Sequence, residues 1–280
     1  MKDFKSVKKT VEGNEGDKCN YPTRLDTYGC GCQHDCKYCY AKSLLEFRDL
    51  WNPKQPSVAN ISDISKQIRK LKKGEVVRLG GMTDCFQPME KLYRNTYKTI
   101  RILNRRKVPY LIVTKSAMVA DKEYVEILDP ELAHIQITVT TLDDELSATY
   151  EKASRPTDRV QAIKTLQREG FDVQLRLSPY IPQNVVIDDF NGLEIDKILV
   201  EFLRVNPWIK KWFDIDYPEY TVKQSGYQHL PLEKKIEYIS KLKFKEMTVC
   251  EDESEAYEYW KYNFNHNPND CCNLRKNTKD

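Results

Sequence analysis

Short apolar runs rich in β-branched residues alternate with stretches of helical character along most of the chain. Five runs predict strands, at residues 75–79, 108–114, 134–141, 171–177 and 197–203. Helical stretches lie between them at residues 61–72, 90–105, 122–128 and 158–169, and Gly170 follows the last as a helix stop. This repeated β-α pattern predicts an α/β fold around a parallel sheet, either open or curved into a full or partial barrel.

The two ends of the chain depart from this pattern. Residues 1–20 are polar with little apolar periodicity, so we expect a flexible N-terminal arm there. After Asn206-Pro207 the sequence becomes aromatic and irregular before helical residues 232–242 and strand-like residues 246–249. We therefore expect a barrel over residues 21–206 and a C-terminal extension over residues 207–280.

Composition narrows the class of protein. The chain has 280 residues, 40% of them hydrophobic, which argues against a disordered protein. The net charge of +3 creates no global field that would by itself indicate nucleic-acid or membrane partners. No apolar run approaches the roughly 18 residues of a membrane span, and residues 1–9 lack the apolar centre of a secretory signal. We expect a cytoplasmic protein with no membrane partner.

The nine cysteines are the unusual feature of the composition. An odd number in a chain of this kind disfavours a disulfide framework and favours metal ligation or reactive thiols. Cys32, Cys36 and Cys39 fall within eight residues, so one loop could hold three corners of an iron–sulfur cluster and leave one iron with open coordination. A structural zinc site would need four protein ligands, and no distant partner pair for Cys36 and Cys39 is evident.

The spacing Cys32-x3-Cys36-x2-Cys39, with the aromatic Tyr38 before the last cysteine, resembles the signature of the radical S-adenosylmethionine (SAM) superfamily. Residues 28–41 resemble more narrowly the branch related to spore photoproduct lyase, often labelled DNA repair photolyases. The likeness continues through residues 79–90 and 113–116, and thinly through residues 200–204. It implies a partial (β/α)6 radical SAM barrel with a C-terminal extension.

The resemblance also implies cofactors and roles for particular residues. Cys32, Cys36 and Cys39 would ligate a [4Fe-4S] cluster whose open iron chelates SAM, and an electron would cleave SAM to a 5'-deoxyadenosyl radical that abstracts hydrogen from the substrate. Flavodoxin or ferredoxin is the kind of partner that donates such an electron. The implied SAM contacts are Tyr38 beside the adenine, Gly80, Gly81 and Thr83 near the amino group, Lys115 near the carboxylate, Thr138 or Thr140 near the ribose, and Arg176.

Two residues are candidates for catalysis. Spore photoproduct lyase resembles this chain in having a tyrosine just after the third cluster cysteine, which is Tyr40 here. The hydrogen-donating cysteine of that enzyme aligns with Gly81, and Cys85 lies four residues later. Cys85 is either a displaced hydrogen donor or a buried thiol, since free cysteines often pack as small hydrophobic residues.

A second group of cysteines lies near the C-terminus. Cys250, Cys271 and Cys272 could form an auxiliary iron–sulfur site, with Cys19 or Cys30 completing the set. A zinc site that uses His266 is the second alternative, and reduced, partly buried thiols are the third.

We expect a radical SAM enzyme that acts on a large substrate, and we favour a nucleic acid because of the likeness to the lyase branch. Residues 208–213 combine basic and aromatic side chains, a composition that could stack nucleobases and contact phosphates. Radical modification of a peptide or protein side chain is an alternative within the class. Outside it, the alternative is a non-catalytic nucleic-acid-binding module that metal only stabilises.

Overall fold

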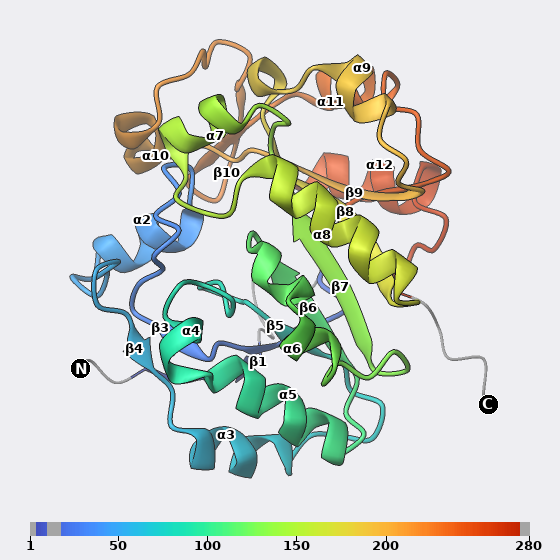
Figure 1. The fold of residues 1–280 in the computed structure, drawn as a ribbon. Coiled ribbons are helices and arrows are strands. Elements are labelled where there is room, and N and C mark those ends of the chain that lie inside the picture. Colours follow the sequence, from blue (N-terminus) through green and yellow to red (C-terminus); the bar gives the residue numbers. More distant parts are fainter. Residues whose placement is uncertain (1–3, 10–17, 275–280) are drawn as a thin grey trace.

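The chain folds around one curved sheet, seen in a computed structural model that describes residues 4–9 and 18–274 (Figure 1). Eight strands follow the order β1-β2-β5-β6-β7-β8-β9-β12, in which β1 is antiparallel to β2 and all other neighbours are parallel. Their bounds are β1 Val7–Lys9, β2 Thr23–Leu25, β5 Val77–Leu79, β6 Tyr110–Thr114, β7 Ala133–Thr138, β8 Asp172–Tyr180, β9 Lys197–Phe202 and β12 Glu246–Val249. The predicted α/β fold with a parallel sheet is confirmed.

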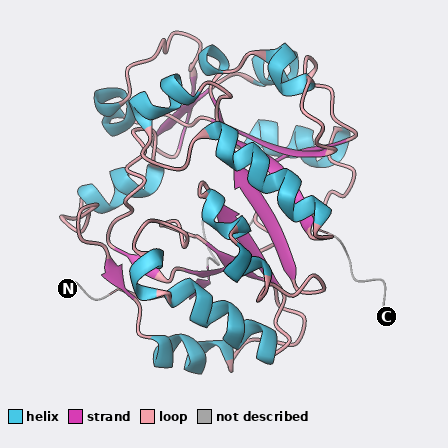
Figure 2. Ribbon diagram, in the orientation of Figure 1, coloured by secondary structure: helices cyan, strands magenta, loops and turns pink. Residues whose placement is uncertain are grey.

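Helices surround the sheet, as Figure 2 shows in cyan around the magenta strands. They are α2 Tyr40–Glu46, α3 Ile61–Ile68, α4 Glu90–Tyr93, α5 Asn95–Arg105, α6 Lys122–Val125, α7 Asp144–Tyr150, α8 Pro156–Arg168, α9 Ile187–Asn191, α10 Pro207–Trp212, α11 Leu232–Ile239 and α12 Ser254–Asn263. Short 3-10 turns occupy Ala117–Ala120 and Pro182–Asn184. Two small hairpins pair β3 (Tyr28–Gly29) with β4 (Ser57–Val58) and β10 (Val222–Gln224) with β11 (Tyr227–His229).

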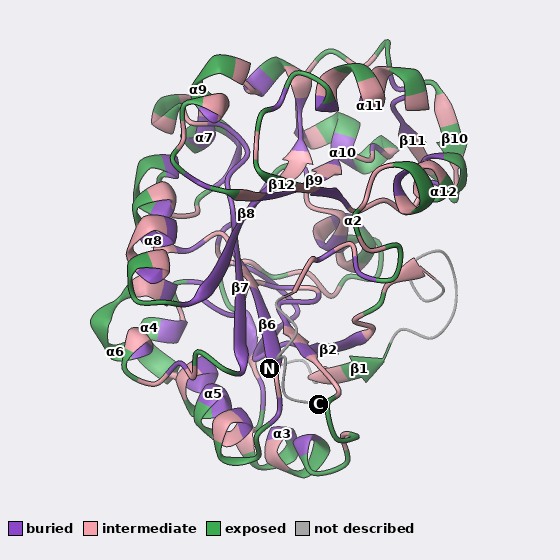
Figure 3. Cartoon of the chain, turned by 90° about the vertical axis from the view of Figure 1, so that its right-hand side faces the viewer, coloured by how far each residue is buried: buried purple, intermediate pink, exposed green. Residues whose placement is uncertain are grey.

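The sheet has an apolar outer face and a largely polar inner face. Figure 3 shows β6, β7 and β8 as buried strands. Helices cover one face of these strands, and the other face points into the concave interior of the sheet. Apolar and polar residues alternate along β7 and β8, as expected when successive side chains point to opposite faces. On the inner side, the His134 ring lies 2.9 Å from a carboxylate oxygen of Asp172, and Gln136 bonds to both Gln174 and Arg176. This interior is lined with polar groups that can serve a site.

The N-terminal segment differs from the expected flexible arm at residues 7–9. Val7–Lys9 forms β1, and the backbone N–H of Asp26 donates a 2.8 Å hydrogen bond to the carbonyl of Ser6. Phe4 and Val7 pack against the main core. The pairing covers the edge of β2, which would otherwise present unpaired backbone groups. Residues 1–3 and 10–17 of the predicted arm lie outside the described residues.

The helix predicted at residues 90–105 is two helices. Arg94, with a φ of +52°, separates α4 from α5. The buried carboxylate of Glu90 accepts hydrogen bonds from the backbone N–H groups of Thr96 (2.8 Å) and Tyr97 (2.9 Å) at the start of α5. These N–H groups have no partner within a helix, and a carboxylate there also complements the helix dipole. The break therefore has a local cause that apolar periodicity does not reveal.

The C-terminal extension adds to the same sheet. Strand β12, predicted as strand-like residues 246–249, pairs in parallel with β9 over its whole length. The backbone N–H of Cys250 continues this ladder to the carbonyl of Val200 at 2.9 Å. The extension is therefore hydrogen-bonded to the barrel, and it brings Cys250 to the carboxyl end of the seventh parallel strand.

Candidate active site

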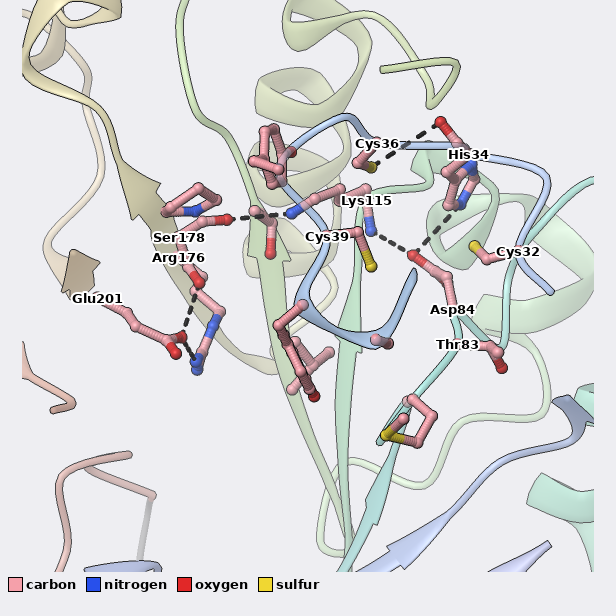
Figure 4. A pocket seen from close by; sticks show the side chains of 18 of the residues that line it. Cys32, His34, Cys36, Cys39, Thr83, Asp84, Lys115, Arg176, Ser178 and Glu201 are labelled. Carbon is pink, nitrogen blue, oxygen red and sulfur yellow. Dashed lines mark hydrogen bonds and ion pairs between the residues drawn. The ribbon is translucent and has the colours of Figure 1, made fainter. Parts of the chain in front are cut away.

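Three cysteines line one cavity at the carboxyl ends of the strands. Cys32, Cys36 and Cys39 lie in the loop between β3 and α2 and border this cavity together (Figure 4). The loop is held by backbone hydrogen bonds to the segment after α7, from Lys37 N to Tyr150 O (2.9 Å) and from Lys152 N to His34 O (2.6 Å). The structure thus brings together all three predicted cluster ligands.

A buried carboxylate, that of Glu151, contacts the cysteine loop and holds it in place. It accepts a hydrogen bond from the Tyr38 hydroxyl and pairs with the guanidinium of Arg159, and both members of this ion pair have fully buried side chains. The Cys36 thiol lies 3.9 Å from the same carboxylate. Although burial opposes it, the charge of Arg159 keeps the pKa of Glu151 below its usual value. Glu151 therefore fixes the Tyr38 ring, whose face the Lys115 ammonium approaches at 5.4 Å.

The turn after β5 is shaped by another buried carboxylate, that of Asp26. This side chain accepts hydrogen bonds from the backbone N–H groups of Gly81 (2.8 Å), Met82 (3.0 Å) and Thr83 (3.1 Å). At Gly80, φ is +89°, and an added Cβ would lie 2.7 Å from the Val113 carbonyl oxygen. Only glycine meets both conditions without strain. The predicted SAM-contact segment therefore borders the cavity as backbone.

Asp84 connects the turn to the third strand of the barrel. Its carboxylate accepts from the Thr114 hydroxyl (2.8 Å) and from the backbone N–H of Lys115 (2.7 Å), and it lies 3.3 Å from Nε2 of His34. Burial alone would raise the pKa of Asp84, but His34 and these donors outweigh it and lower the pKa. His34 is thus directed at Asp84, beside the three thiols.

Lys115 and Arg176 place two cations along the cavity wall (Figure 4). The Lys115 ammonium donates a 3.0 Å hydrogen bond to the Ser178 carbonyl. Arg176 pairs with Glu201, which also accepts a 2.7 Å hydrogen bond from the Ser178 hydroxyl. Against the effect of burial, the neighbouring guanidinium groups of Arg176 and Arg204 lower the pKa of Glu201 to about 2.

The structure separates the remaining candidates. Thr138 lines the cavity, whereas the Thr140 hydroxyl lies 3.0 Å from the Tyr150 hydroxyl and outside the lining. Tyr40 borders the cavity, and its hydroxyl donates a 2.6 Å hydrogen bond to the Gly81 carbonyl. Cys85 is 1% exposed, packs in the main core and directs its thiol toward the Leu25 carbonyl. Its position corresponds to the buried thiol rather than to a hydrogen donor in the cavity.

Several site residues were not found from the sequence. Asp26, Glu151 and Glu201 act through contacts that span 25 to 113 residues of sequence, which no local motif encodes. Ser178 carries a usable signal, because residues 172–178 alternate strictly between polar and apolar. A buried parallel strand is normally apolar on both faces, so this alternation marks a polar interior.

The residues around the cavity fit an iron–sulfur cluster with one open iron. Within the described part of the chain, the three thiols and the Asp84-paired His34 are the cysteines and histidines that line it. Three thiolates satisfy three of the four irons of a cubane. Beside them, Gly80 and Gly81 border the cavity, and Lys115 offers a cation to a carboxylate.

Comparison with known proteins decides the family. The family model of the radical SAM superfamily matches residues 27–188, which span the cysteine loop and strands β5 to β8 of the sheet. The chain belongs to the radical SAM superfamily. A [4Fe-4S] cluster and SAM are the cofactors that membership implies, and Cys32, Cys36 and Cys39 are the residues placed to hold the cluster.

Relatives of this radical SAM protein include archaeal and mycobacterial proteins. The uncharacterized protein MJ0683 of Methanocaldococcus jannaschii is 25% identical over 202 residues, which cover 68% of this chain and 74% of that protein. The uncharacterized protein Rv2578c of Mycobacterium tuberculosis is 26% identical over 180 residues, or 60% of this chain and about half (52%) of that protein.

Solved structures share the fold at low identity. A spore photoproduct lyase variant with bound AdoMet and dinucleoside spore photoproduct superposes with a TM-score of 0.62 at 14% identity, covering 83% of this chain and 77% of that one. Streptococcus suis SuiB bound to the precursor peptide SuiA gives 0.56 at 15% identity, covering 81% of this chain and 48% of that one. Both likenesses support the radical SAM barrel.

The second group of predicted metal ligands lies outside this cavity. Cys250 and Cys271 line a second cavity on the other side of Arg176 and Glu201, and Cys272 is buried beside it. His266, the predicted zinc ligand, is exposed and borders neither cavity. Across the described residues, no helix combines the length and the apolar character that a membrane crossing requires.

Proposed function

We propose that this radical SAM enzyme abstracts a hydrogen atom from a nucleotide of a nucleic acid, in repair or base modification. When bound, the cluster and SAM supply the hydrogen-abstracting radical, and the protein supplies the placement of the substrate. The observation that carries the proposal is a surface of basic and aromatic side chains directly beside the cysteine loop. We call it the Lys/Trp surface. It consists of Lys37, Lys42, Trp208, Lys210, Lys211 and Trp212.

The Lys/Trp surface is built by the contact between α2 and α10, which lie next to each other in Figures 1 and 3. The Asn206 amide at the start of α10 donates a 3.0 Å hydrogen bond to the Ser43 hydroxyl on α2. On α10, the Trp208 and Trp212 ring centroids are 5.7 Å apart, and the Lys42 ammonium lies 4.8 Å from the Trp212 ring. Because α2 begins at Tyr40, this surface directly follows the last cluster cysteine.

The side chains of this surface suit an unpaired nucleotide. Trp208 is 36% exposed although it is apolar, and Lys37, Lys210 and Lys211 are exposed. Base–aromatic stacking contributes about 1–3 kcal/mol per base, and lysines contact the phosphates. An enzyme that reacts at a base must also take it out of a duplex or act on a single strand. The likeness to a lyase that binds a dinucleoside photoproduct supports the same substrate class.

Peptide modification is the second candidate, and the likeness to peptide-bound SuiB favours it. A cationic surface, however, is better matched to phosphates than to an arbitrary peptide. Reversal of a lesion by a lyase-type cysteine lacks support here, because the cysteines that line the cavity among the described residues are the three cluster ligands. Tyr40, whose hydroxyl reaches the Gly81 carbonyl at the cavity, stays the candidate for hydrogen transfer.

The test is SAM cleavage by anaerobically reconstituted protein. After reduction, 5'-deoxyadenosine is measured with single-stranded DNA, duplex DNA, RNA or unrelated peptides present. We expect wild-type protein to form 5'-deoxyadenosine, with the highest rate on a nucleic acid, and Cys36→Ala to form none. Cys85→Ser, which changes a thiol outside the cavity, is the matched control and should keep its cluster. Bound metal without any SAM cleavage would instead identify a non-catalytic module.

Binding tests the substrate class separately. A Lys210→Ala, Lys211→Ala double variant should bind single-stranded oligonucleotides more weakly, with the slope of log affinity against log salt reduced by about 1.4 for two lost contacts. Its cleavage of SAM in the absence of substrate should equal that of wild type, because neither lysine lines the cavity. Absence of binding to any nucleic acid at low salt, or peptide-only stimulation, would contradict the proposal.

A further inference from the structure

Four cysteines from three distant segments converge on the inner side of the sheet. Cys19 precedes β2, Cys250 directly follows β12, and Cys271 and Cys272 follow α12. Cys250 and Cys271 pack in one small cluster with the buried Cys272. Cys19, Cys250 and Cys271 line the second cavity together.

The fold holds these thiols in place rather than leaving them on a loose tail. The ladder bond from Cys250 N to Val200 O fixes the first of them at the end of β12. The Asp270 carboxylate accepts hydrogen bonds from the backbone N–H groups of Cys272 (3.0 Å) and Leu274 (3.1 Å), which shapes the turn that carries the adjacent pair. The Cys272 side chain is 6% exposed and packs in a small cluster with Leu111 and Leu199.

The surroundings of these sulfurs carry positive charge and unused donors. Arg78 and Arg176 line the second cavity together with Cys19, Cys250 and Cys271. Nε of Arg78 and Nε1 of Trp260 are buried without a hydrogen-bond acceptor, and Trp260, which also lines this cavity, is 1% exposed. Buried donors are nearly always paired, so these two indicate an acceptor or anion in the cavity.

The spacing of the sulfurs favours a cluster over a single ion. In the part of the chain that the structure describes, His229, Glu251 and Asp252 form the one group of three ligand atoms within 4.8 Å of one another. A tetrahedral zinc ion with Zn–S bonds of about 2.3 Å would bring every pair of sulfurs to within about 3.8 Å. Among the described residues, no three of the four cysteines have sulfurs that all lie within 4.8 Å of one another, and the same holds for Cys32, Cys36 and Cys39, which border the site of the first cluster.

Adjacent cysteines also fit a cluster better than one ion. On a single zinc, Cys271 and Cys272 would both have to approach one atom from neighbouring positions of the chain. On a cubane, each thiolate binds a different iron, so the two sulfurs need not converge. A cubane with four thiolates is an anion, and Arg78 and Arg176 are placed to offset its charge.

We propose that Cys19, Cys250, Cys271 and Cys272 hold a second [4Fe-4S] cluster, coordinated entirely by protein thiolates. It lies on the far side of the Arg176–Glu201 ion pair, whose two residues line both cavities. With four protein ligands this cluster has no open iron, so it does not bind SAM. The proposal is independent of the substrate of the enzyme.

Iron counting and electron paramagnetic resonance of anaerobically reconstituted protein test the site. Wild type should bind about eight irons per chain, and a Cys32→Ala, Cys36→Ala, Cys39→Ala triple variant should keep about four. The reduced spectrum of this triple variant should not change when SAM is added. Ser substitutions at Cys19, Cys250, Cys271 and Cys272 together should also leave about four irons, now with a SAM-sensitive spectrum. Cys85→Ser is the control, with about eight.

The two single-cluster variants make the result independent of activity. The proposal is overturned if the Cys32, Cys36 and Cys39 triple variant binds no iron, or if it binds about one zinc in place of iron. It is also overturned if wild type saturates at about four irons, all of them SAM-sensitive. Failure of every nucleic acid to act as substrate would leave the iron counts unchanged, so the two proposals fail separately. Should the Ser variant misfold, the triple variant still decides, because it leaves all four thiols intact.

Discussion

Replacing Glu151 by glutamine tests the argument that a buried ion pair supports the cysteine loop. Glu151→Gln keeps an oxygen that can accept the Tyr38 hydroxyl but removes the charge opposite Arg159. Arg159 is fully buried and also donates to the carbonyls of Thr138 (2.9 Å) and Ser154 (2.6 Å), so it cannot turn toward water without losing these bonds. The variant therefore leaves a buried guanidinium with no counterion.

The expected cost follows from this geometry. Removing one partner of a buried ion pair typically costs about 3–5 kcal/mol. Unfolding entropy of about 2.1 cal/mol/K per residue amounts to about 0.6 kcal/mol/K for a chain of 280 residues. The midpoint of thermal unfolding should then fall by about 5–8 °C. We expect Glu151→Gln, Arg159→Met to recover part of this loss, because no unpaired charge remains buried.

The assay is thermal unfolding followed by circular dichroism at neutral pH, on matched anaerobic preparations. Glu237→Gln is the control, since Glu237 forms a half-exposed i,i+4 pair with Lys241 and should change the midpoint by less than about 1 °C. A fall of less than about 2 °C for Glu151→Gln would refute the reasoning. So would a double variant that is less stable than Glu151→Gln, because the loss would then not arise from an unpaired guanidinium.

Two further predictions concern the turn after β5 and the pH dependence of stability. Gly80→Ala should lower the free energy of unfolding by about 1–3 kcal/mol and weaken SAM binding, because φ is +89° and the new Cβ would meet the Val113 carbonyl. Denaturant unfolding measures the first effect and equilibrium dialysis the second. Wild-type values in both would contradict the assigned strain. Burial lowers the pKa of His229 to about 4, so between pH 6.5 and 4 the unfolded chain binds more protons and the folded protein loses stability as the pH falls. In His229→Gln, urea unfolding should show a smaller loss over this window, and an unchanged pH dependence would contradict the shift.

Much of the barrel could be predicted from the sequence because its signals are local. The strand at residues 197–203 and β9 (Lys197–Phe202) nearly coincide, and the cysteine spacing located three of the site thiols. Of the residues that the resemblance implied as SAM contacts, all but Thr140 line the cavity at the carboxyl ends of the strands. The sequence did not reveal that the helix at residues 90–105 breaks at Arg94, because the cap of the second part is the buried carboxylate of Glu90, six residues before the Thr96 N–H that it binds.

Residues that act through tertiary contacts escaped prediction. Glu151 precedes α8 with no motif around it, and its role arises because the fold brings Tyr38 within hydrogen-bonding distance from 113 positions away. Cys85 shows the converse. Its place in the motif suggested chemistry, yet the Asp26-held turn leaves its side chain in the core, where burial raises the pKa of the thiol. Cys19 and Cys30 were alternatives for completing the C-terminal set of cysteines, and the structure places Cys19 rather than Cys30 in the cavity with Cys250 and Cys271.

Because Asp26 binds the amide hydrogens of the turn after β5, the backbone groups that this turn can still present to a ligand all carry partial negative charge. The amide hydrogens of Gly81, Met82 and Thr83 are all directed at the Asp26 carboxylate. What this stretch of backbone can still offer a ligand is therefore carbonyl oxygen, the negative end of the peptide dipole. Such a turn attracts an ammonium group and repels a carboxylate, whereas Lys115 across the cavity does the reverse. We therefore expect the two walls to discriminate between the ends of a zwitterion, and they are preorganised to do so before any amino acid moiety enters.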